Sequence, residues 1–321
     1  MRRNPIIAEP LYKEVEFYPW EVKLFQTSYV RRLKYLAHFG GGAYVSPVVH
    51  SRYEHTVGVW KLAAVYFPNH PLLRAAAILH DIGHLPFSHA VEKTLGYNHQ
   101  ALTEEYIQSP EIVSILHTAN LEPSDIIHYL RLPSPLTGTR NILGLDHLDS
   151  FLRDTYMSGK IEEIPSGLIK RIHCSERGIE TDEQTGLQLL RLIVQDHELF
   201  LSPLLLAVDR LLAEAISLYW KYDEKNKNSF TEQTDADMIA ALKASQNSKV
   251  RDIINTILYQ PEQINVHQNS TGKGISFGIR KVYHKSPIVN GTLLSETAKG
   301  KEILNRLERL KKEYKVNIPS L

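Results

Sequence analysis

AAILHDIGHLPFSH, residues 76–89, is the most informative stretch of the chain. It closes a helix that opens at Pro71, a residue well suited to the first helical position. The alanine-rich interior of this helix can approach neighbouring helices closely. Its end carries the adjacent pair His80-Asp81, and Gly83 and Pro86 then interrupt the helix. The stretch therefore predicts a buried helix that presents an imidazole and a carboxylate where it ends.

Helical periodicity continues on both sides of this stretch. Apolar residues recur at helical spacing from Trp20 to Phe39, where three glycines follow, and again from Tyr53 to Tyr66. Residues 43–50 are predicted to be an irregular or hairpin-like connection. Further helices are expected at 88–95, 99–108, 110–117, 123–131 and 141–157. The first half of the chain is therefore predicted to be all α.

The second half of the chain has a different sequence pattern, in which strand-like segments occur between helices. KRIHCSERGIETDE, residues 170–183, predicts a small hairpin, and GISFGIRKVYH, residues 274–284, alternates as a strand does. Helices are expected at 183–199, 203–222, 228–248 and 294–315. NSTGKG at 269–274 is interpreted as a turn, because the leading glycine of a phosphate-binding loop is missing. We predict a mainly α fold with small β elements in the C-terminal half, divided into a catalytic core, 1–165, and a mostly helical region, 166–321, packed on it.

Composition excludes several classes of protein. Lys and Arg number 37 against 36 for Asp and Glu, so binding to nucleic acid is not indicated. The single cysteine, Cys174, rules out an intramolecular disulfide framework and fits a reducing compartment. The N-terminal residues lack the apolar core of a signal peptide, and charged residues interrupt the most apolar later stretch, 199–220. We therefore expect a cytoplasmic protein without a membrane span.

Histidine and aspartate residues point to metal chemistry. Six of the 15 histidines fall between residues 50 and 99. His55, the pair His80-Asp81 and Asp146 combine imidazole with carboxylate, which suits Mn, Fe, Zn, Co or Ni and, less ideally, Mg. Such an ion can lower the pKa of bound water to about 7, which provides hydroxide for attack on phosphorus.

Three motifs occur in the order typical of one enzyme family. SRYEHTVGV at 51–59, AAILHDIGHLPFSH at 76–89 and LDHLDSFLRD at 145–154 resemble the HD-superfamily deoxynucleotide triphosphohydrolases, over about residues 20–160. The resemblance implies an HD-domain helical bundle and a metal bound by the H…HD…D set, which maps onto His55, His80, Asp81 and Asp146. Asp149 is the reserve candidate for the last ligand.

The resemblance also implies roles around the metal. His84 and His99 correspond to catalytic histidines near the leaving phosphoryl oxygens, with His89 in support and Glu92 in place of a family aspartate. Arg52 would contact phosphate, although it could instead cap or pair at a surface. Asp154 would face the sugar, although a helical ion pair is the alternative.

The chain departs from the family on the substrate side. His147 occupies the place of a phosphate-binding lysine, Ser150 that of a nucleotide-contacting tyrosine, and His38 that of a sugar-contacting glutamine. No triphosphate-binding arginine can be aligned near residues 199–206. Histidines taken singly are otherwise expected to be structural; these are His38, His70, His117, His128, His173 and His197.

These observations leave three functions open. The first is a (deoxy)nucleoside triphosphate triphosphohydrolase that uses metal-activated water. The second is a nucleoside monophosphatase or phosphodiesterase of the same superfamily, which needs fewer phosphate contacts. The third is a nucleotide-binding regulatory protein without catalysis, against which the retained His84 and His99 argue. Relatives are often oligomers, so a homo-oligomer of at least two subunits is expected.

Overall fold

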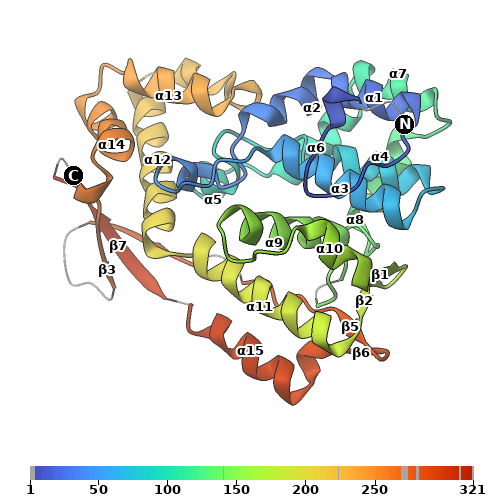
Figure 1. Ribbon diagram of the computed structural model, residues 1–321. Helices are drawn as coiled ribbons and strands as arrows, with labels where there is room; N and C mark the ends of the chain where they lie inside the picture. The colour runs from blue at the N-terminus through green and yellow to red at the C-terminus, as the bar shows by residue number, and fades with distance from the viewer. Residues whose placement is uncertain are drawn as a thin grey trace.

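Helices make up most of the computed structural model, which describes residues 4–139, 141–222, 224–268, 274–279, 282–310 and 312–319. The predicted mainly α fold with small β elements in the C-terminal half is confirmed (Figure 1). Most of the predicted turn at 269–274 lies outside the described residues. Among the described residues, no helix combines the length and apolarity needed to cross a bilayer.

The first half contains the predicted series of helices. They are α1 Pro19–Gln26, α2 Ser28–Arg32, α3 Arg52–Tyr66, α4 Pro71–Leu79, α5 Glu92–Leu95, α6 His99–Ile107, α7 Pro110–His117, α8 Pro123–Arg131 and α9 Leu145–Met157. One boundary differs clearly from the prediction. The helix expected from Trp20 to Phe39 breaks at Thr27, whose backbone is extended (φ −61°, ψ 153°) and whose hydroxyl accepts from the Val30 amide. A local side-chain cap therefore ends one helix and starts the next, although the apolar periodicity continues across it.

The second half combines helices with two small sheets. Its helices are α10 Pro165–Leu168, α11 Glu183–Phe200, α12 Pro203–Tyr222, α13 Asp235–Lys243, α14 Ser248–Tyr259 and α15 Ala298–Glu308. The strands are β1 Ile172–Ser175, β2 Gly178–Thr181, β3 Asn265–Gln268, β4 Ile275–Gly278, β5 Ile288–Val289, β6 Thr292–Leu293 and β7 Glu313–Asn317. They form one sheet of order β1-β2-β5-β6 and another of order β3-β7-β4. The predicted hairpin at 170–183 is confirmed as β1-β2.

The helix predicted for 294–315 is wrong at its C-terminal end. α15 stops at Glu308, and residues Glu313–Asn317 form β7 between β3 and β4. Val316 of β7 is fully buried there. Pairing with two distant strands outweighs the helical preference of this charged segment, because helix propensity is a weak prior against tertiary packing.

Two large buried apolar clusters and one small one hold the described elements together. The first runs from Ile7 to Leu307, and the second joins residues 85–91 to α12, α14 and β7. Figure 1 shows α9 above α11 and α11 above α15, as their contacts require. Each cluster contains side chains from both sides of residue 165, and the division of the chain at that point stays a prediction.

Helix α3 contacts side chains of α9 at Gly58. A Cβ on Gly58 of α3 would lie 2.1 Å from Asp149 Oδ1 and 2.3 Å from Arg153 Nη2 of α9. Only glycine at this position leaves room for the buried ion pair between Asp149 and Arg153 to pack against α3. The close contact brings Asp149 to His55, one turn earlier on α3.

Asp235, at the start of α13, connects the C-terminal half to two loops of the first half. Its carboxylate accepts from the backbone amides of Ala37 (2.8 Å) and Phe87 (2.7 Å). Phe87 and Ser88 have left-handed backbone conformations, with φ of 61° and 55°. Such conformations are costly for residues other than glycine and persist only where the surroundings enforce them. The hydrogen bond from the Phe87 amide to Asp235 helps to stabilise this loop conformation.

We predict that Asp235→Ala lowers the free energy of unfolding by about 2–4 kcal/mol, because two buried amides lose a charged acceptor. Asp235→Asn keeps one acceptor oxygen and should cost less. Denaturant titration followed by circular dichroism measures both. Asp252→Ala, at an exposed position of α14, is the control and should change stability by no more than about 0.5 kcal/mol. Equal stability of Asp235→Ala and Asp252→Ala would contradict the role of Asp235.

Candidate metal centre

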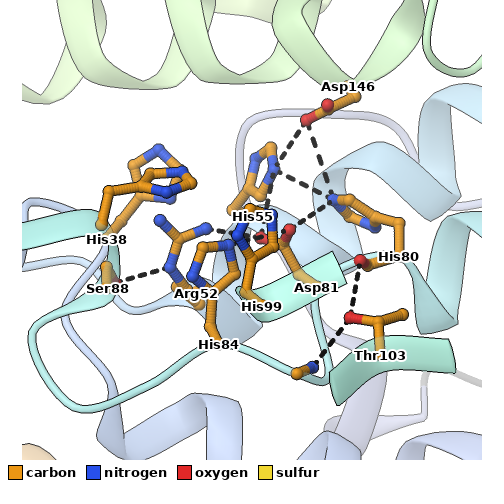
Figure 2. Close-up of polar contacts among 12 residues, drawn as sticks. His38, Arg52, His55, His80, Asp81, His84, Ser88, His99, Thr103 and Asp146 are labelled. Atoms are coloured by element: carbon orange, nitrogen blue, oxygen red, sulfur yellow. Dashed lines mark hydrogen bonds and ion pairs between the residues drawn. The ribbon is translucent and has the colours of Figure 1, made fainter. Parts of the chain in front are cut away.

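Three helices bring the predicted ligands to one point. His55 lies on the first turn of α3, His80 follows the last residue of α4, Asp81 comes next, and Asp146 is the second residue of α9. Figure 2 shows these four side chains pointing toward one another. The structure thus brings together all four residues that the sequence assigned to the metal.

The separations between donor atoms fit a single ion. His55 Nε2 lies 3.2 Å from Asp146 Oδ1 and 3.4 Å from His80 Nε2. Asp81 lies opposite, with Oδ1 3.5 Å from His80 Nε2 and Oδ2 3.9 Å from His55 Nε2. Ligand atoms about 2.0–2.2 Å from a common ion lie about 3–4 Å from one another. One donor atom from each of His55, His80 and Asp146 lies within 4.8 Å of the others, and Asp81 lies beside this group.

The outward nitrogens of both rings are already occupied. His80 Nδ1 lies 2.9 Å from the Ala77 carbonyl oxygen, which can only accept, so this nitrogen carries the proton. His55 Nδ1 donates in the same way to Asp149 Oδ2 at 2.8 Å. In the neutral rings both Nε2 atoms are therefore lone-pair donors that face each other and two carboxylates. This donor set fits a divalent cation, and the contacts behind the rings are those that orient metal-binding histidines.

Electrostatics in the protein alone also favour a positive charge at this point. Burial lowers the pKa of His55, but hydrogen bonds to Asp146 and Asp149 outweigh it and raise the pKa to about 10. Asp146 is the most exposed of the four side chains, at 28% against 1–9% for the others. The open side of the site therefore lies at Asp146.

Asp149, the reserve ligand candidate, has different partners. It is fully buried and accepts two hydrogen bonds from Arg153, which also lies 3.0 Å from Glu9 Oε1. Burial would raise the pKa of Asp149, but Arg153 and His55 lower it to about 2. Its carboxylate supports His55 from behind, whereas Asp146 lies on the side of His55 Nε2.

Arg52 contacts the centre rather than open solvent. Its guanidinium is buried, with Nη1 2.6 Å from Asp81 Oδ2 and Nε donating to Ser88 Oγ at 2.6 Å. The sequence predicted a phosphate contact for this residue. Here the guanidinium binds Oδ2 of a carboxylate in the candidate metal centre, and Ser88 links it to the loop whose Phe87 amide donates to Asp235.

A second group of side chains adjoins Asp81. His84 Nε2 is 3.3 Å from Asp81 Oδ1, and the His84 ring stacks on His99 at 4.2 Å and 13°. Glu92 accepts from His99 Nδ1 at 2.6 Å and from His89 Nδ1 at 3.0 Å. The three predicted catalytic histidines thus lie together beside the Glu92 carboxylate.

Gly83 allows this group to form. A Cβ at this position would lie 2.2 Å from the His99 carbonyl oxygen and 2.3 Å from the Thr103 amide. The amide of Gly83 also donates to Thr103 Oγ1 at 3.0 Å (Figure 2). The loop after His80-Asp81 therefore packs directly on the start of α6, which places His84 beside His99.

The residues predicted to contact the substrate lie in two separate places. His38 and Asp154 lie together, 3.6 Å apart from Nε2 to Oδ2, in a buried cluster that also contains His50 and Asp196. His147 is elsewhere, next to Asp146, with its ring 4.8 Å from that of Tyr283. Sequence reasoning assigned no role to His50, Asp196 or Tyr283. Only His50 had a sequence signal, because it lies in the histidine-rich window.

Comparison with known proteins supports the motifs. Residues 52–151 match the HD domain family. The chain contains an HD domain. This segment holds all four candidate ligands, and the predicted HD resemblance is confirmed.

Three relatives illustrate how far the similarity extends. An uncharacterized protein of Methanocaldococcus jannaschii is 25% identical over 282 residues, covering 79% of this chain and 58% of that protein. The deoxynucleoside triphosphate triphosphohydrolase SAMHD1 of Mus musculus is 26% identical over 168 residues, covering 43% of this chain and 26% of the enzyme. The human enzyme of that name is 34% identical over 101 residues, covering 26% and 16%. The chain spans 58%, 26% and 16% of the length of these relatives, less than two thirds of each.

A solved structure shares the whole fold. The crystal structure of a hypothetical protein from Aquifex aeolicus superposes with a TM-score of 0.67 at 22% identity, covering 97% of this chain and 95% of that one. Similarity at this level of identity establishes the fold alone. It extends to the C-terminal half, where the sequence motifs end.

We predict that His80→Ala and Asp81→Ala each deplete the bound divalent metal, because each removes a donor to the same ion. Their fold should largely survive, since the centre lies on helices held by an apolar core. Metal analysis of purified variants, with circular dichroism as the folding check, tests this. His117→Ala, at a half-exposed position, is the control and should retain wild-type metal. Full metal content in either ligand variant would refute the proposed ligand set.

Proposed function

We propose that this HD-domain protein is a metal-dependent phosphohydrolase that acts on nucleotides, as a (deoxy)nucleoside triphosphate triphosphohydrolase. The observation that carries the proposal is the juxtaposition of two groups. The His55/His80/Asp81/Asp146 donor set lies directly beside the His84/His99/His89/Glu92 cluster, and Asp81 belongs to the first while touching the second. A cation site next to several histidines suits phosphoryl chemistry, in which charge and protons must both be managed.

The chain's own residues have distinct tasks in this proposal. A bound divalent cation acts as a Lewis acid toward a phosphoryl oxygen and makes hydroxide available near neutral pH. Burial would raise the pKa of Glu92, but hydrogen bonds from His89 and His99 hold it well below its usual range. The ionised Glu92 accepts from Nδ1 of His99 and of His89 and so orients both rings, with Nε2 of His99 directed away from this carboxylate.

His84 is suited to the leaving-group side. Its buried ring lies between Asp81 and His99, in contact with both. Burial, together with the Arg52 guanidinium, holds the pKa of His84 well below its usual range, so the neutral ring can orient the departing oxygen or accept a proton, while a bound cation would stabilise charge on the phosphoryl group. For a triphosphohydrolase the bond that breaks joins the nucleoside to the α-phosphate.

The second candidate is a nucleoside monophosphatase or phosphodiesterase, and one observation favours it. Arg52 is engaged by Asp81 and Ser88, and His147 stands where a phosphate-binding lysine would provide a permanent charge. Fewer cationic side chains then face a polyphosphate. A monoester or diester requires fewer such contacts, and the same metal chemistry would cleave it.

A non-catalytic nucleotide sensor is the proposal from a different class. The Glu92-held histidines argue against it, because a binding protein has no need of an acid–base group beside the cation. We also propose a homo-oligomer in the cytoplasm, since the resemblance implies assembly and Cys174 fits a reducing compartment. Light scattering on the purified protein measures the assembly.

The direct test of function is turnover of a nucleotide panel with Mn, Mg, Co or Fe, resolved by chromatography. A triphosphohydrolase must convert a dNTP into nucleoside plus inorganic tripolyphosphate without nucleoside monophosphate. Orthophosphate released from a monophosphate, with triphosphates untouched, would establish the second candidate instead. Saturable binding of nucleotides without any product would establish the sensor.

We predict that His84→Ala lowers turnover by about 10²–10⁴-fold while the metal content stays at the wild-type level, as expected for loss of a positioned acid or base. Metal and turnover are measured on the same sample. A metal-free variant would make His84 a ligand, and a metal-loaded, fully active variant would transfer its role to His99.

A further inference from the structure

Apart from the first centre and the adjoining His84/His89/Glu92/His99 group, one more convergence of donor atoms lies among the described residues. His38 precedes the glycine run, His50 precedes α3, and Asp154 lies two turns beyond Asp146 on α9. His50 Nε2 is 2.8 Å from Asp154 Oδ1, and His38 Nε2 is 3.6 Å from Asp154 Oδ2. One ligand atom from each of the three residues lies within 4.8 Å of the others. These separations resemble those among the donors of the first centre.

This cluster is deeply buried yet poorly hydrogen-bonded. The exposed fractions are 9% for His38, 3% for His50, 1% for Asp154 and 6% for Asp196. Among the described residues, neither Asp154 oxygen nor His50 Nε2 has a hydrogen bond of acceptable geometry, despite their closeness, and Asp196 Oδ1 lacks one too. Buried polar atoms are nearly always satisfied, so such a group requires an explanation. Atoms that bind one metal ion point toward the ion, so they lie close to one another without the geometry of a hydrogen bond. This cluster has that arrangement.

Two carboxyl groups share this interior: burial and the neighbouring Asp154 raise the pKa of Asp196 well above its usual range, so Asp196 is neutral beside the Asp154 carboxylate without an ion. The only basic groups in contact with Asp154 among the described residues are the two histidines. Buried charges are normally paired or coordinate metals. A divalent cation would satisfy the carboxylates and the ring nitrogens together.

We propose that His38, His50 and Asp154, with Asp196 beside them, form a second divalent-cation site behind the His55 ring. The His38 and His55 rings are 4.7 Å apart at 48°, so His55 separates the two sites. The nitrogen and carboxylate donors suit Zn, Mn, Fe, Co or Ni. The resemblance assigns Asp154 to a sugar, but His38 and His50 give this carboxylate the partners of a metal ligand.

The second site should bind more weakly than the first. Nδ1 of His55 and of His80 is held by Asp149 and by a backbone carbonyl, whereas Nδ1 of His38 and His50 has no hydrogen-bond partner among the described residues. Loss of such a supporting contact costs about 10–100-fold in metal affinity. We therefore expect two dissociation constants that differ by about this factor. The inference does not depend on which phosphate ester is cleaved.

The test is metal stoichiometry of the full chain. Chelator-stripped protein is titrated with Mn²⁺ by calorimetry, and ions per chain are counted by mass spectrometry at saturation. Wild type should take up two ions, the His50→Ala variant should lose only the weaker one, and His80→Ala should lose the tighter one. Saturation of wild type at one ion, as a hydrogen-bonded cluster or a sugar contact requires, would overturn the proposal.

A matched set of variants separates coordination from folding. His117→Ala is the control and should bind two ions. If circular dichroism shows that His50→Ala is unfolded, the near-isosteric Asp154→Asn takes its place, because it keeps the shape but weakens the donor. Two ions of unchanged affinity in folded His50→Ala or Asp154→Asn would contradict the assignment.

Discussion

The convergence of two imidazole Nε2 atoms and two carboxylates inside the protein is the constraint on which the rest of the site depends. His55 Nε2 and His80 Nε2 lie 3.4 Å apart because a buried carboxylate and a backbone carbonyl hold the opposite nitrogens of the rings. Burial lowers the pKa of His55, but hydrogen bonds to Asp146 and Asp149 raise it to about 10, so without an ion a proton lies between His55 Nε2 and Asp146. A divalent cation can replace that proton and bind both rings and the carboxylates together.

Several local features serve this arrangement. Gly58 lets α9 approach α3 so that Asp149 reaches His55, and Gly83 lets the loop after Asp81 pack on α6. Arg52 binds Oδ2 of Asp81 and donates to Ser88. Ser88 belongs to the loop with positive φ angles, whose Phe87 amide donates to Asp235 of the C-terminal half. The metal centre lies within the HD segment, but residues far outside that segment fix its geometry. This is the physical reason to expect the chain to work as one unit.

The sequence predicted the parts of the site that local patterns encode. His80-Asp81 could be found because a buried alanine-rich helix ends there, and His55 because its motif begins a helix. Spacing could not choose between Asp146 and Asp149, which are three residues apart on one helix. The choice depends on how α9 is rotated against α3, and Gly58 determines that contact. Asp196, Asp235 and Tyr283 belong to no motif and reach the site only through tertiary packing. The strand at residues 313–317 was missed for the same reason, because its paired residues lie 35 to 52 positions away in the sequence.

Anomalous diffraction from crystals of the Mn²⁺-loaded protein tests the central claim most directly. The account predicts a strong peak about 2.0–2.2 Å from His55 Nε2, His80 Nε2 and a carboxylate oxygen of both Asp81 and Asp146. Asp149 should remain hydrogen-bonded to His55 Nδ1, outside the coordination sphere. A peak bound by Asp149 in place of Asp146, or no peak among these four side chains, would contradict it.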